Sequence, residues 1–269
     1  MKQLCVEDCH DLDSLRHRLE KSPIFKSWLL HTNLGELYGS ASINDKEILL
    51  NALFHSSFVN ENTELIRFSN ERLEFLGDAF LDAEISMILY QSFPQLTEGP
   101  LSKIRSSIVN EDILAQWALE LHIDQVVFIG KGEKKKDYIE PAILADTFEA
   151  IIGAIGLLSY SNLRTLLEKW IKIYDDTRPA SEIKLIDPER LILFDPKTRL
   201  QEKTLELFKA LPKYFYEEVD GGFIVSIEVQ EKKMASAFGK SKKKAEVSAA
   251  KEILLNKKID KIAKELLTE

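Results

Sequence analysis

The stretch ERLEFLGDAFLD (71–82) opens a proline-free run that extends to Tyr90 and decides which fold we expect. At about 100° per residue, its four acidic side chains fall within roughly 80° of one another on one face of a helix. These side chains are Glu71, Glu74, Asp78 and Asp82. The opposite face is apolar and carries Leu73 and Phe80. We therefore predict a long helix over residues 71–90 that is buried on one side and acidic on the other.

A second acidic helix is predicted over residues 142–158, which include the stretch ADTFEAIIGA (145–154). Asp146 and Glu149 are three residues apart and so share a face, and the rest of the helix is almost wholly apolar, which predicts burial. Carboxylates at this spacing repel one another, and burial increases the cost. A hard divalent cation such as Mg²⁺ relieves this repulsion with oxygen ligands and commonly lies between carboxylates and substrate phosphates.

The acidic faces have two alternative interpretations. Each carboxylate could be solvated or paired with a Lys or Arg, which would account well for one such helix but less well for two. A di-iron bundle needs a Glu-x-x-His spacing on facing helices, and neither acidic helix carries a His there; His55 and His122 lie elsewhere in the sequence. The matching pair of acidic helices therefore favours a metal site.

The rest of the first 175 residues is predicted to be helical, because no alternating strand pattern occurs before residue 195. Further helices are expected at 45–54, 102–110, 112–121 and 163–174, with turn formers at 34–39, a polar loop at 60–70 and a charged loop at 131–137. Residues 175–195 contain Pro179 and Pro188 without a sustained period and are predicted to be a linker, with a short helical piece near 191–194.

The C-terminal part shows a different pattern. A helix over 197–211 is followed by strands at 214–219, 223–229 and 234–239, and by a last helix over 241–255. The predicted fold is thus an all-α domain followed by a small α+β domain of the order α-β-β-β-α.

Charge is divided unequally between these two parts. The 269-residue chain has a net charge of −8, yet residues 196–258 hold 14 Lys/Arg against 9 Asp/Glu, a net +5, and residues 1–195 carry −12. Ser241 is a good N-cap, and Lys242, Lys243 and Lys244 follow in the first helical turn. Free N–H groups and positive potential at a helix N-terminus bind phosphates, so the basic module favours a nucleic-acid partner.

The composition limits the compartment and the other sites. No apolar run approaches the roughly 20 residues of a membrane helix, and the first residues do not resemble a secretory signal. A disulfide between Cys5 and Cys9, near one terminus, could not stabilise so long a chain, so nothing implies an oxidising compartment. With His10 they could form part of an alternative metal site, but no fourth ligand is evident, and an ordinary N-terminal segment is the favoured interpretation. We expect a cytoplasmic protein with no membrane partner.

The stretch ERLEFLGDA (71–79) matches the signature of bacterial ribonuclease III at each position, and the resemblance extends over roughly residues 35–255. The flanking segments LLNALFHSSF (49–58), EGPLSKIRSSIVN (98–110) and ILADTFEA (143–150) resemble the same family. DPKTRLQE (195–202) and GKSKKKAE (239–246) resemble the two ends of a double-stranded-RNA-binding domain.

The resemblance implies functional roles for individual residues. Glu74, Asp78, Asp146 and Glu149 fall at the metal-ligand positions of the family, and Glu71 at an acidic position near the substrate. Phe75 matches an aromatic residue that packs across the axis of a homodimer. Residues implied to bind RNA are Gln201, Glu202, Lys240, Ser241, Lys242, Lys243 and Lys244.

The family cleaves double-stranded RNA by two-metal-ion hydrolysis with Mg²⁺, for which Mn²⁺ can substitute. The products carry 5′-phosphate and 3′-hydroxyl ends with short 3′ overhangs, and the substrates are ribosomal and messenger RNA. The resemblance implies an N-terminal extension (1–30), a helical endonuclease domain (31–175), a linker (176–194), an RNA-binding domain (195–258) and a C-terminal tail (259–269).

The chain departs from the family at three places. The connection DGG (220–222) is shorter than usual and lacks the family's His, which puts one RNA contact in doubt. The loop 131–142 lacks a glycine-arginine-serine run, and residues 1–30 have no counterpart. A catalytically silent RNA-binding or ribosome-associated protein is the main alternative. A helical dimerisation scaffold would explain the apolar helices but neither the acidic faces nor the lysines of the last helix.

Overall fold

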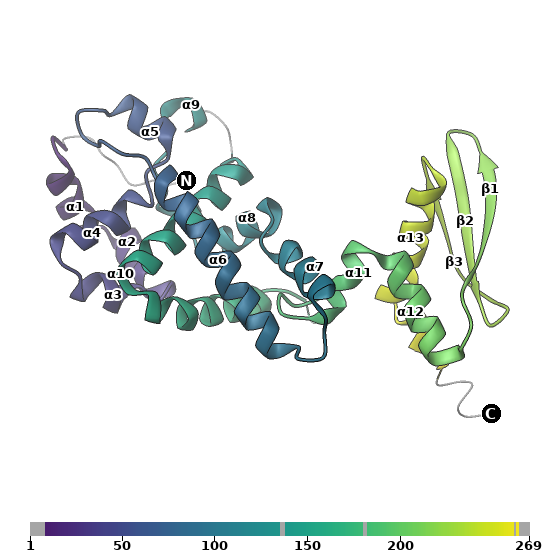
Figure 1. Ribbon diagram of the computed structural model, residues 1–269. Helices are drawn as coiled ribbons and strands as arrows, with labels where there is room; N and C mark the ends of the chain where they lie inside the picture. The colour runs from purple at the N-terminus through teal and green to yellow at the C-terminus, as the bar shows by residue number, and fades with distance from the viewer. Residues whose placement is uncertain (1–8, 135–137, 180–181, 261, 264–269) are drawn as a thin grey trace. The chain divides into compact units, whose positions relative to one another are not determined.

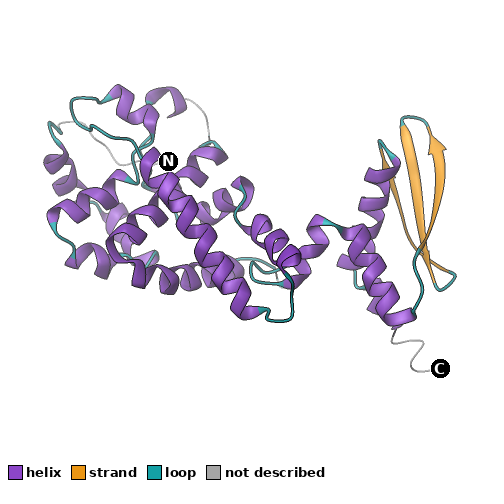
Figure 2. Ribbon diagram, in the orientation of Figure 1, coloured by secondary structure: helices purple, strands orange, loops and turns teal. Residues whose placement is uncertain are grey.

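The computed structural model describes residues 9–134, 138–179, 182–260, 262 and 263. The chain divides into two compact units, Met1–Ile186 and Asp187–Glu269. The described part of the first unit is helical, and all described strands lie in the second (Figure 2). This architecture confirms the predicted fold of an all-α domain followed by an α-β-β-β-α domain.

The helices of the first unit follow one another with short connections (Figure 1). They are α1 (Leu12–Lys21), α2 (Pro23–His31), α3 (Gly35–Ser40), α4 (Ile43–Asn51), α5 (Ser56–Glu61), α6 (Glu71–Ser92), α7 (Glu98–Ile108), α8 (Glu111–Glu120), the 3₁₀ turn η1 (Ile123–Gln125), α9 (Lys131–Lys134) and α10 (Pro141–Asp176).

Helix α10 forms the centre of this unit, because residues 143–156 in its first half are buried on nearly every face. Helices α6 and α8 make the most extensive contacts with it. The backbone of α10 is non-helical at Ser159 (φ −158°, ψ 72°), so its two halves correspond to the two helices predicted over 142–158 and 163–174. Among the described residues, α10 is long and apolar enough to cross a membrane, but 67% of its most apolar window is buried inside the protein, as in a core helix.

The N-terminal helices α1 and α2 belong to the core of the first unit. Leu15, Leu19, Phe25 and Trp28 are buried, and the indole Nε1 of Trp170 on α10 donates a hydrogen bond of 2.8 Å to the carbonyl of Thr32. Residues 12–31, which have no assigned counterpart in the family, are therefore structural. Of the alternative metal site, Cys5 lies outside the described residues and Cys9 is a free cysteine.

Local differences from the predicted elements have local causes. The segment 34–39, predicted as turns, forms most of α3. Within the predicted charged loop, residues 131–134 form α9 because Lys131 N–H is held by the Glu61 carboxylate at 2.8 Å; residues 135–137 lie outside the described residues.

The second unit begins with the 3₁₀ turn η2 (Pro188–Arg190) and α11 (Leu191–Phe194), followed by α12 (Pro196–Phe208), the sheet and α13 (Lys242–Leu255). Strands β1 (Lys213–Val219), β2 (Gly222–Val229) and β3 (Lys232–Gly239) form an antiparallel sheet in the order β1-β2-β3. The β1–β2 turn is Asp220–Gly221, and the φ of +78° at Gly221 explains a glycine there.

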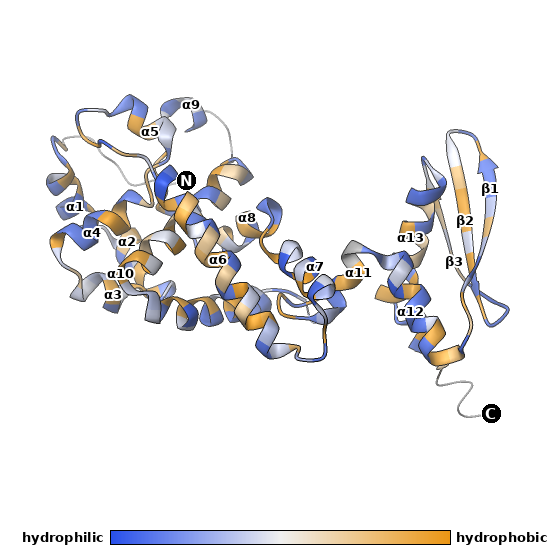
Figure 3. Ribbon diagram, in the orientation of Figure 1, coloured by the Kyte–Doolittle hydropathy of each residue, from blue (hydrophilic) through white to orange (hydrophobic). Residues whose placement is uncertain are grey.

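The core of this unit lies between one face of the sheet and the helices α12 (Pro196–Phe208) and α13 (Lys242–Leu255). Strand β2 is mainly apolar (Figure 3) and contributes Val225, Ile227 and Val229. Ile259 and Ile262, beyond α13, are buried in the same core.

The prediction that the first helix of this unit extends to residue 211 is wrong. Helix α12 ends at Phe208 because Lys209 adopts a left-handed conformation (φ 55°) and donates its N–H to Leu205 O. Leu211 therefore does not share the buried face of α12; it is 60% exposed.

Candidate active site and RNA-binding surface

Two glycines allow α6 and α10 to approach until their backbones touch. A Cβ atom at Gly77 of α6 would lie 1.8 Å from the carbonyl oxygen of Glu149, and one at Gly153 of α10 would lie 2.1 Å from that of Leu73. Real Cβ contacts are essentially never below 3.0 Å, so only glycine fits at either position. The first acidic helix is thus fixed directly against the second.

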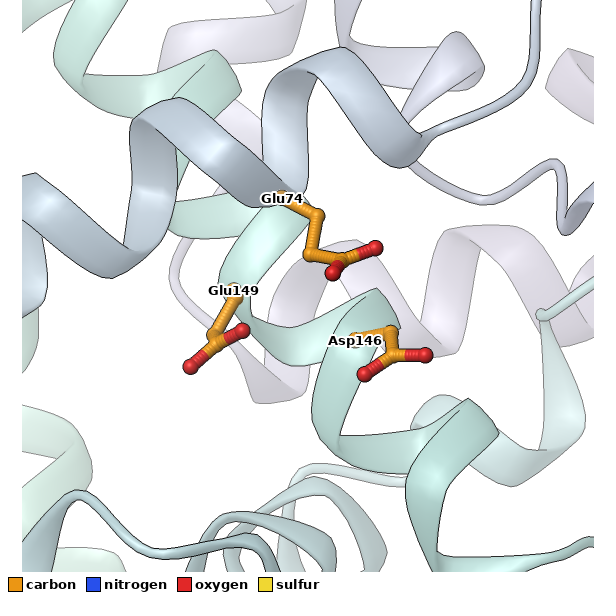
Figure 4. A group of neighbouring side chains, drawn as sticks. All are labelled: Glu74, Asp146 and Glu149. Carbon is orange, nitrogen blue, oxygen red and sulfur yellow. The ribbon is translucent and has the colours of Figure 1, made fainter.

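This crossing brings together three of the predicted carboxylates. Glu74 of α6 and Asp146 and Glu149 of α10 each offer an oxygen, and these oxygens lie within 4.8 Å of one another. In Figure 4 the three side chains turn toward a shared space, and all three are half-buried. The donor set is all oxygen, which suits a hard cation such as Mg²⁺ or Mn²⁺ rather than a metal that prefers sulfur.

The pKa values of the three carboxyl groups show that their charged forms are unfavourable at this site. Burial, and then the charges of neighbouring carboxylates with Asp78 first, raises the pKa of Glu149 to about 7. Burial is also the main cause of the raised pKa of Glu74, with the charge of Asp146 next. Burial raises the pKa of Asp146 as well. A divalent cation among these oxygens would offset this repulsion.

The other two acidic residues implied for the site lie at its edge. Asp78 is exposed and does not belong to the group of three, although its charge is the largest electrostatic influence on Glu149. Glu71 is exposed at the start of α6 and accepts a hydrogen bond of 2.8 Å from Ser69 Oγ. The structure therefore brings together three of the four residues expected to bind metal, with Asp78 within electrostatic range.

A histidine that no sequence pattern assigns to the site lies near this group. The half-buried His55 and Asp146 each have the other as their largest charge interaction, and burial lowers the pKa of His55. Its Nδ1 lies 2.7 Å from Ser57 Oγ, which accepts the N–H of Gly130 at 2.9 Å. The Ser57 hydroxyl is then free to donate to Nδ1, and the proton of a neutral His55 belongs on Nε2.

Sequence reasoning also missed Gly77 and Gly153. Their signal was available, because a glycine inside a helical pattern costs about 1 kcal/mol relative to alanine and often marks a close approach. For His55 the sequence offers no spacing to the acidic residues that would predict their proximity.

In the second unit, the predicted RNA-binding residues lie at the start of α13 and in the middle of α12. Ser241 caps α13 and accepts a hydrogen bond of 3.3 Å from the N–H of Lys244. Lys240 and the three lysines that follow Ser241 are all exposed. On α12, Gln201 is half-buried, and Glu202 is exposed and pairs with Arg199 at 3.2 Å.

The predicted dimer residue Phe75 lies on the surface of α6. Its side chain is 81% exposed, the largest exposed fraction among the large hydrophobic side chains of the described residues. An aromatic ring so exposed on a core helix marks a candidate surface for association.

Comparison with known proteins agrees with both units. Residues 45–173 match the family model described as Ribonuclease-III-like, and residues 196–257 match the double-stranded RNA binding motif. The chain is 39% identical over 214 residues to Ribonuclease 3 of Bdellovibrio bacteriovorus, an alignment that covers 77% of this chain and 88% of the relative. It is 38% identical to that of Aliarcobacter butzleri (77% and 89%) and 36% identical to that of Dehalococcoides mccartyi (82% and 94%).

These identities extend over most of the length of each relative, and the two family models match one unit each. The chain belongs to the ribonuclease III family of endoribonucleases.

Proposed function

We propose that this protein cleaves double-stranded RNA at the acidic group formed by Glu74, Asp146 and Glu149, with Asp78 as a further ligand. The observation that carries this proposal is the convergence of three half-buried carboxylates whose oxygens lie within 4.8 Å of one another. Burial and mutual repulsion raise the pKa of Glu149 to about 7, and a divalent cation among these oxygens would offset both effects.

The group can hold a divalent metal ion, and we propose that two Mg²⁺ ions bind there, with Mn²⁺ as a substitute. When bound, such ions supply an activated water and stabilise the leaving oxygen of the phosphodiester. Glu74, Asp146 and Glu149 hold the cations, and the backbone contact at Gly77 and Gly153 fixes the two helices that carry these carboxylates. Exposed Glu71 lies at the rim, where the RNA passes.

The products are proposed to carry 5′-phosphate and 3′-hydroxyl ends with short 3′ overhangs. That outcome requires two sites, each of which cuts one strand, and therefore a homodimer. Exposed Phe75 supports an interface along α6. We propose cytoplasmic ribosomal and messenger RNA as the substrates.

The second unit is proposed to hold the duplex. The exposed lysines at the start of α13 meet phosphates, and Gln201 and Glu202 of α12 face the minor groove. Such recognition depends mainly on the shape of the duplex. With only Asp220–Gly221 between β1 and β2, no side chain of that turn supplies the family's His contact.

The test is incubation of a long RNA duplex with the purified protein in Mg²⁺ and in EDTA, beside a single-stranded control, on a denaturing gel. We expect cleavage of the duplex alone and only with the metal. Glu149→Gln should abolish cleavage and keep RNA binding. Asp82→Asn is the matched control, because Asp82 lies on the same helix as Glu74 and pairs with Arg105 at 3.7 Å outside the group of three.

Cleavage by Glu149→Gln at the wild-type rate would refute the metal assignment. Tight binding without cleavage, in Mg²⁺ and in Mn²⁺, would identify a non-catalytic RNA-binding protein of the same fold.

A further inference from the structure

A buried carboxylate lies between the two helices that carry the proposed RNA-binding residues. Glu246 of α13 is 8% exposed. One of its oxygens accepts a hydrogen bond of 2.6 Å from Lys197 Nζ of α12, and the other accepts one of 2.6 Å from the hydroxyl of Tyr216 on β1. Glu246 therefore ties both helices and the sheet together at one point.

Aromatic rings of the sheet contact lysines on both sides of this carboxylate. Lys197 Nζ lies 5.2 Å from the ring centroid of Tyr214. Lys242 Nζ lies 5.7 Å from that of Tyr216 and 5.3 Å from that of Phe223. Cation–π contacts at such distances favour defined positions for the two ammonium groups.

Glu246 is ionised in this network. Burial acts to raise the pKa of its carboxyl, but the hydrogen bonds from Lys197 and Tyr216 outweigh burial and lower it. A lysine ammonium has three donors, so the single bond from Lys197 to Glu246 leaves two for another acceptor. Because the Lys197 side chain is still 36% exposed, a phosphate can reach it.

We propose that Lys197 binds an RNA phosphate and that Glu246 is a positioning residue, which holds Lys197 directly and Lys242 through the ring of Tyr216. This inference rests on the proposed RNA-binding surface of the second unit. It extends that surface, which already includes the lysines of α13 and Gln201 and Glu202 of α12, to the first turn of α12.

Two opposite results distinguish positioning from simple electrostatics. If Glu246 acted only by its charge, its removal would make the surface more positive and tighten RNA binding. If Glu246 positions Lys197, its removal frees the lysine to move and weakens binding. Each phosphate contact contributes about 0.9 to the slope of log K against log salt, measured for a DNA duplex. Loss of one contact lowers affinity about eight-fold near 0.1 M salt.

The experiment measures binding of full-length protein to an RNA duplex of about 16 base pairs, the length that one such domain spans. EDTA is present to prevent cleavage, and salt is varied from about 50 to 200 mM. The variants are Lys197→Met, Glu246→Gln and the double variant. Lys243→Met tests the α13 surface itself, and Glu252→Gln removes a carboxylate of α13 that is paired with Lys258 at the same 2.6 Å.

We expect Lys197→Met and Glu246→Gln each to lower the slope by about 0.9 and the double variant to lower it no further, whereas Glu252→Gln leaves it unchanged. Tighter binding or an unchanged slope in Glu246→Gln would overturn the positioning role. If circular dichroism shows that Glu246→Gln does not fold, Lys197→Met provides the test. An unchanged slope in Lys197→Met together with a lowered slope in Lys243→Met would refute the role of Lys197 and leave the proposed RNA-binding surface of α13 intact. An unchanged slope in Lys243→Met as well would refute the proposed surface on which it rests.

Discussion

Replacement of Gly77 by alanine tests whether the backbone contact between α6 and α10 builds the acidic group. The added Cβ would lie 1.8 Å from the Glu149 carbonyl oxygen, 2.5 Å from its carbonyl carbon and 2.9 Å from Gly153 N. An ordinary C···O contact is about 3.3 Å, so the helices must separate by on the order of 1.5 Å. All three obstructing atoms are backbone atoms, so no side-chain rotation relieves the clash.

The expected cost follows from two opposing effects. Overpacking of this kind destabilises the folded state by about 3 kcal/mol at the upper end of its usual range. The better helix propensity of alanine stabilises the folded state by roughly 1 kcal/mol. The net loss of about 2 kcal/mol corresponds to a fall in Tm of about 4–8 °C for a unit of this size. Because the separation also moves Glu74 away from Glu149, Mn²⁺ binding should weaken by about ten-fold or more.

The assays are thermal unfolding by circular dichroism and Mn²⁺ titration by calorimetry. Gly99→Ala is the matched control, because a Cβ atom at Gly99 of α7 would meet no atom within 4 Å and α7 is outside the acidic group. We expect Gly99→Ala to leave the Tm unchanged or raise it and to leave Mn²⁺ binding unchanged. If Gly77→Ala behaves like Gly99→Ala in both assays, the close contact does not exist and the argument for the site geometry fails.

Three further predictions concern the charge, the association and the second unit of the protein. Because the pKa of Glu149 is raised from 4.5 to about 7, the contribution of this carboxyl group to stability is present at low pH and is lost as pH rises through 7. The increase in Tm on addition of Mg²⁺ should therefore be larger at about pH 8 than at about pH 5. An equal increase at both pH values would contradict this prediction. Phe75→Asp should shift the protein from dimer toward its monomer mass of 30.8 kDa by light scattering, whereas Leu30→Asp, at a residue 77% exposed on α2, should not; an unshifted mass for Phe75→Asp would count against the α6 interface. Removal of residues 196–269 should weaken RNA binding and confine cleavage to lower salt, since charge neutralisation drives such binding; an unchanged salt dependence would rule out the basic module as the RNA anchor.

The sequence predicts the elements of this fold well because their signals are local. The period of ERLEFLGDA and of the apolar helix around Asp146 predicts two helices with acidic faces, and both are present as α6 and α10. Strands β1 and β2 are equally clear from their β-branched and aromatic residues. The end of α12 was missed because it depends on the left-handed backbone of one residue, Lys209, which is not a type that favours that conformation.

The candidate site is only partly predictable for a different reason. Helical period gives the angle of Glu74 or Asp78 about the helix axis, but not the distance from one helix to the next. That distance is determined by Gly77 and Gly153, and the result places Glu74 in the group and leaves Asp78 exposed. The proximity of His55 depends on the pairing of residues 53–55 with Phe128, including His55 N–H to Phe128 O at 3.1 Å, which no periodic pattern signals.

The hydrogen bond from Trp170 to the Thr32 carbonyl has a consequence for synthesis on the ribosome. These residues are 138 positions apart, and at a translation rate of about 5–20 residues per second Thr32 waits roughly 7–28 s for its partner. The carbonyl of Trp170 also accepts a hydrogen bond of 3.1 Å from the indole N–H of Trp117. Trp170, which is synthesised late, therefore forms hydrogen bonds with two segments that are synthesised earlier. The first unit therefore cannot complete its core until α10 has left the ribosome.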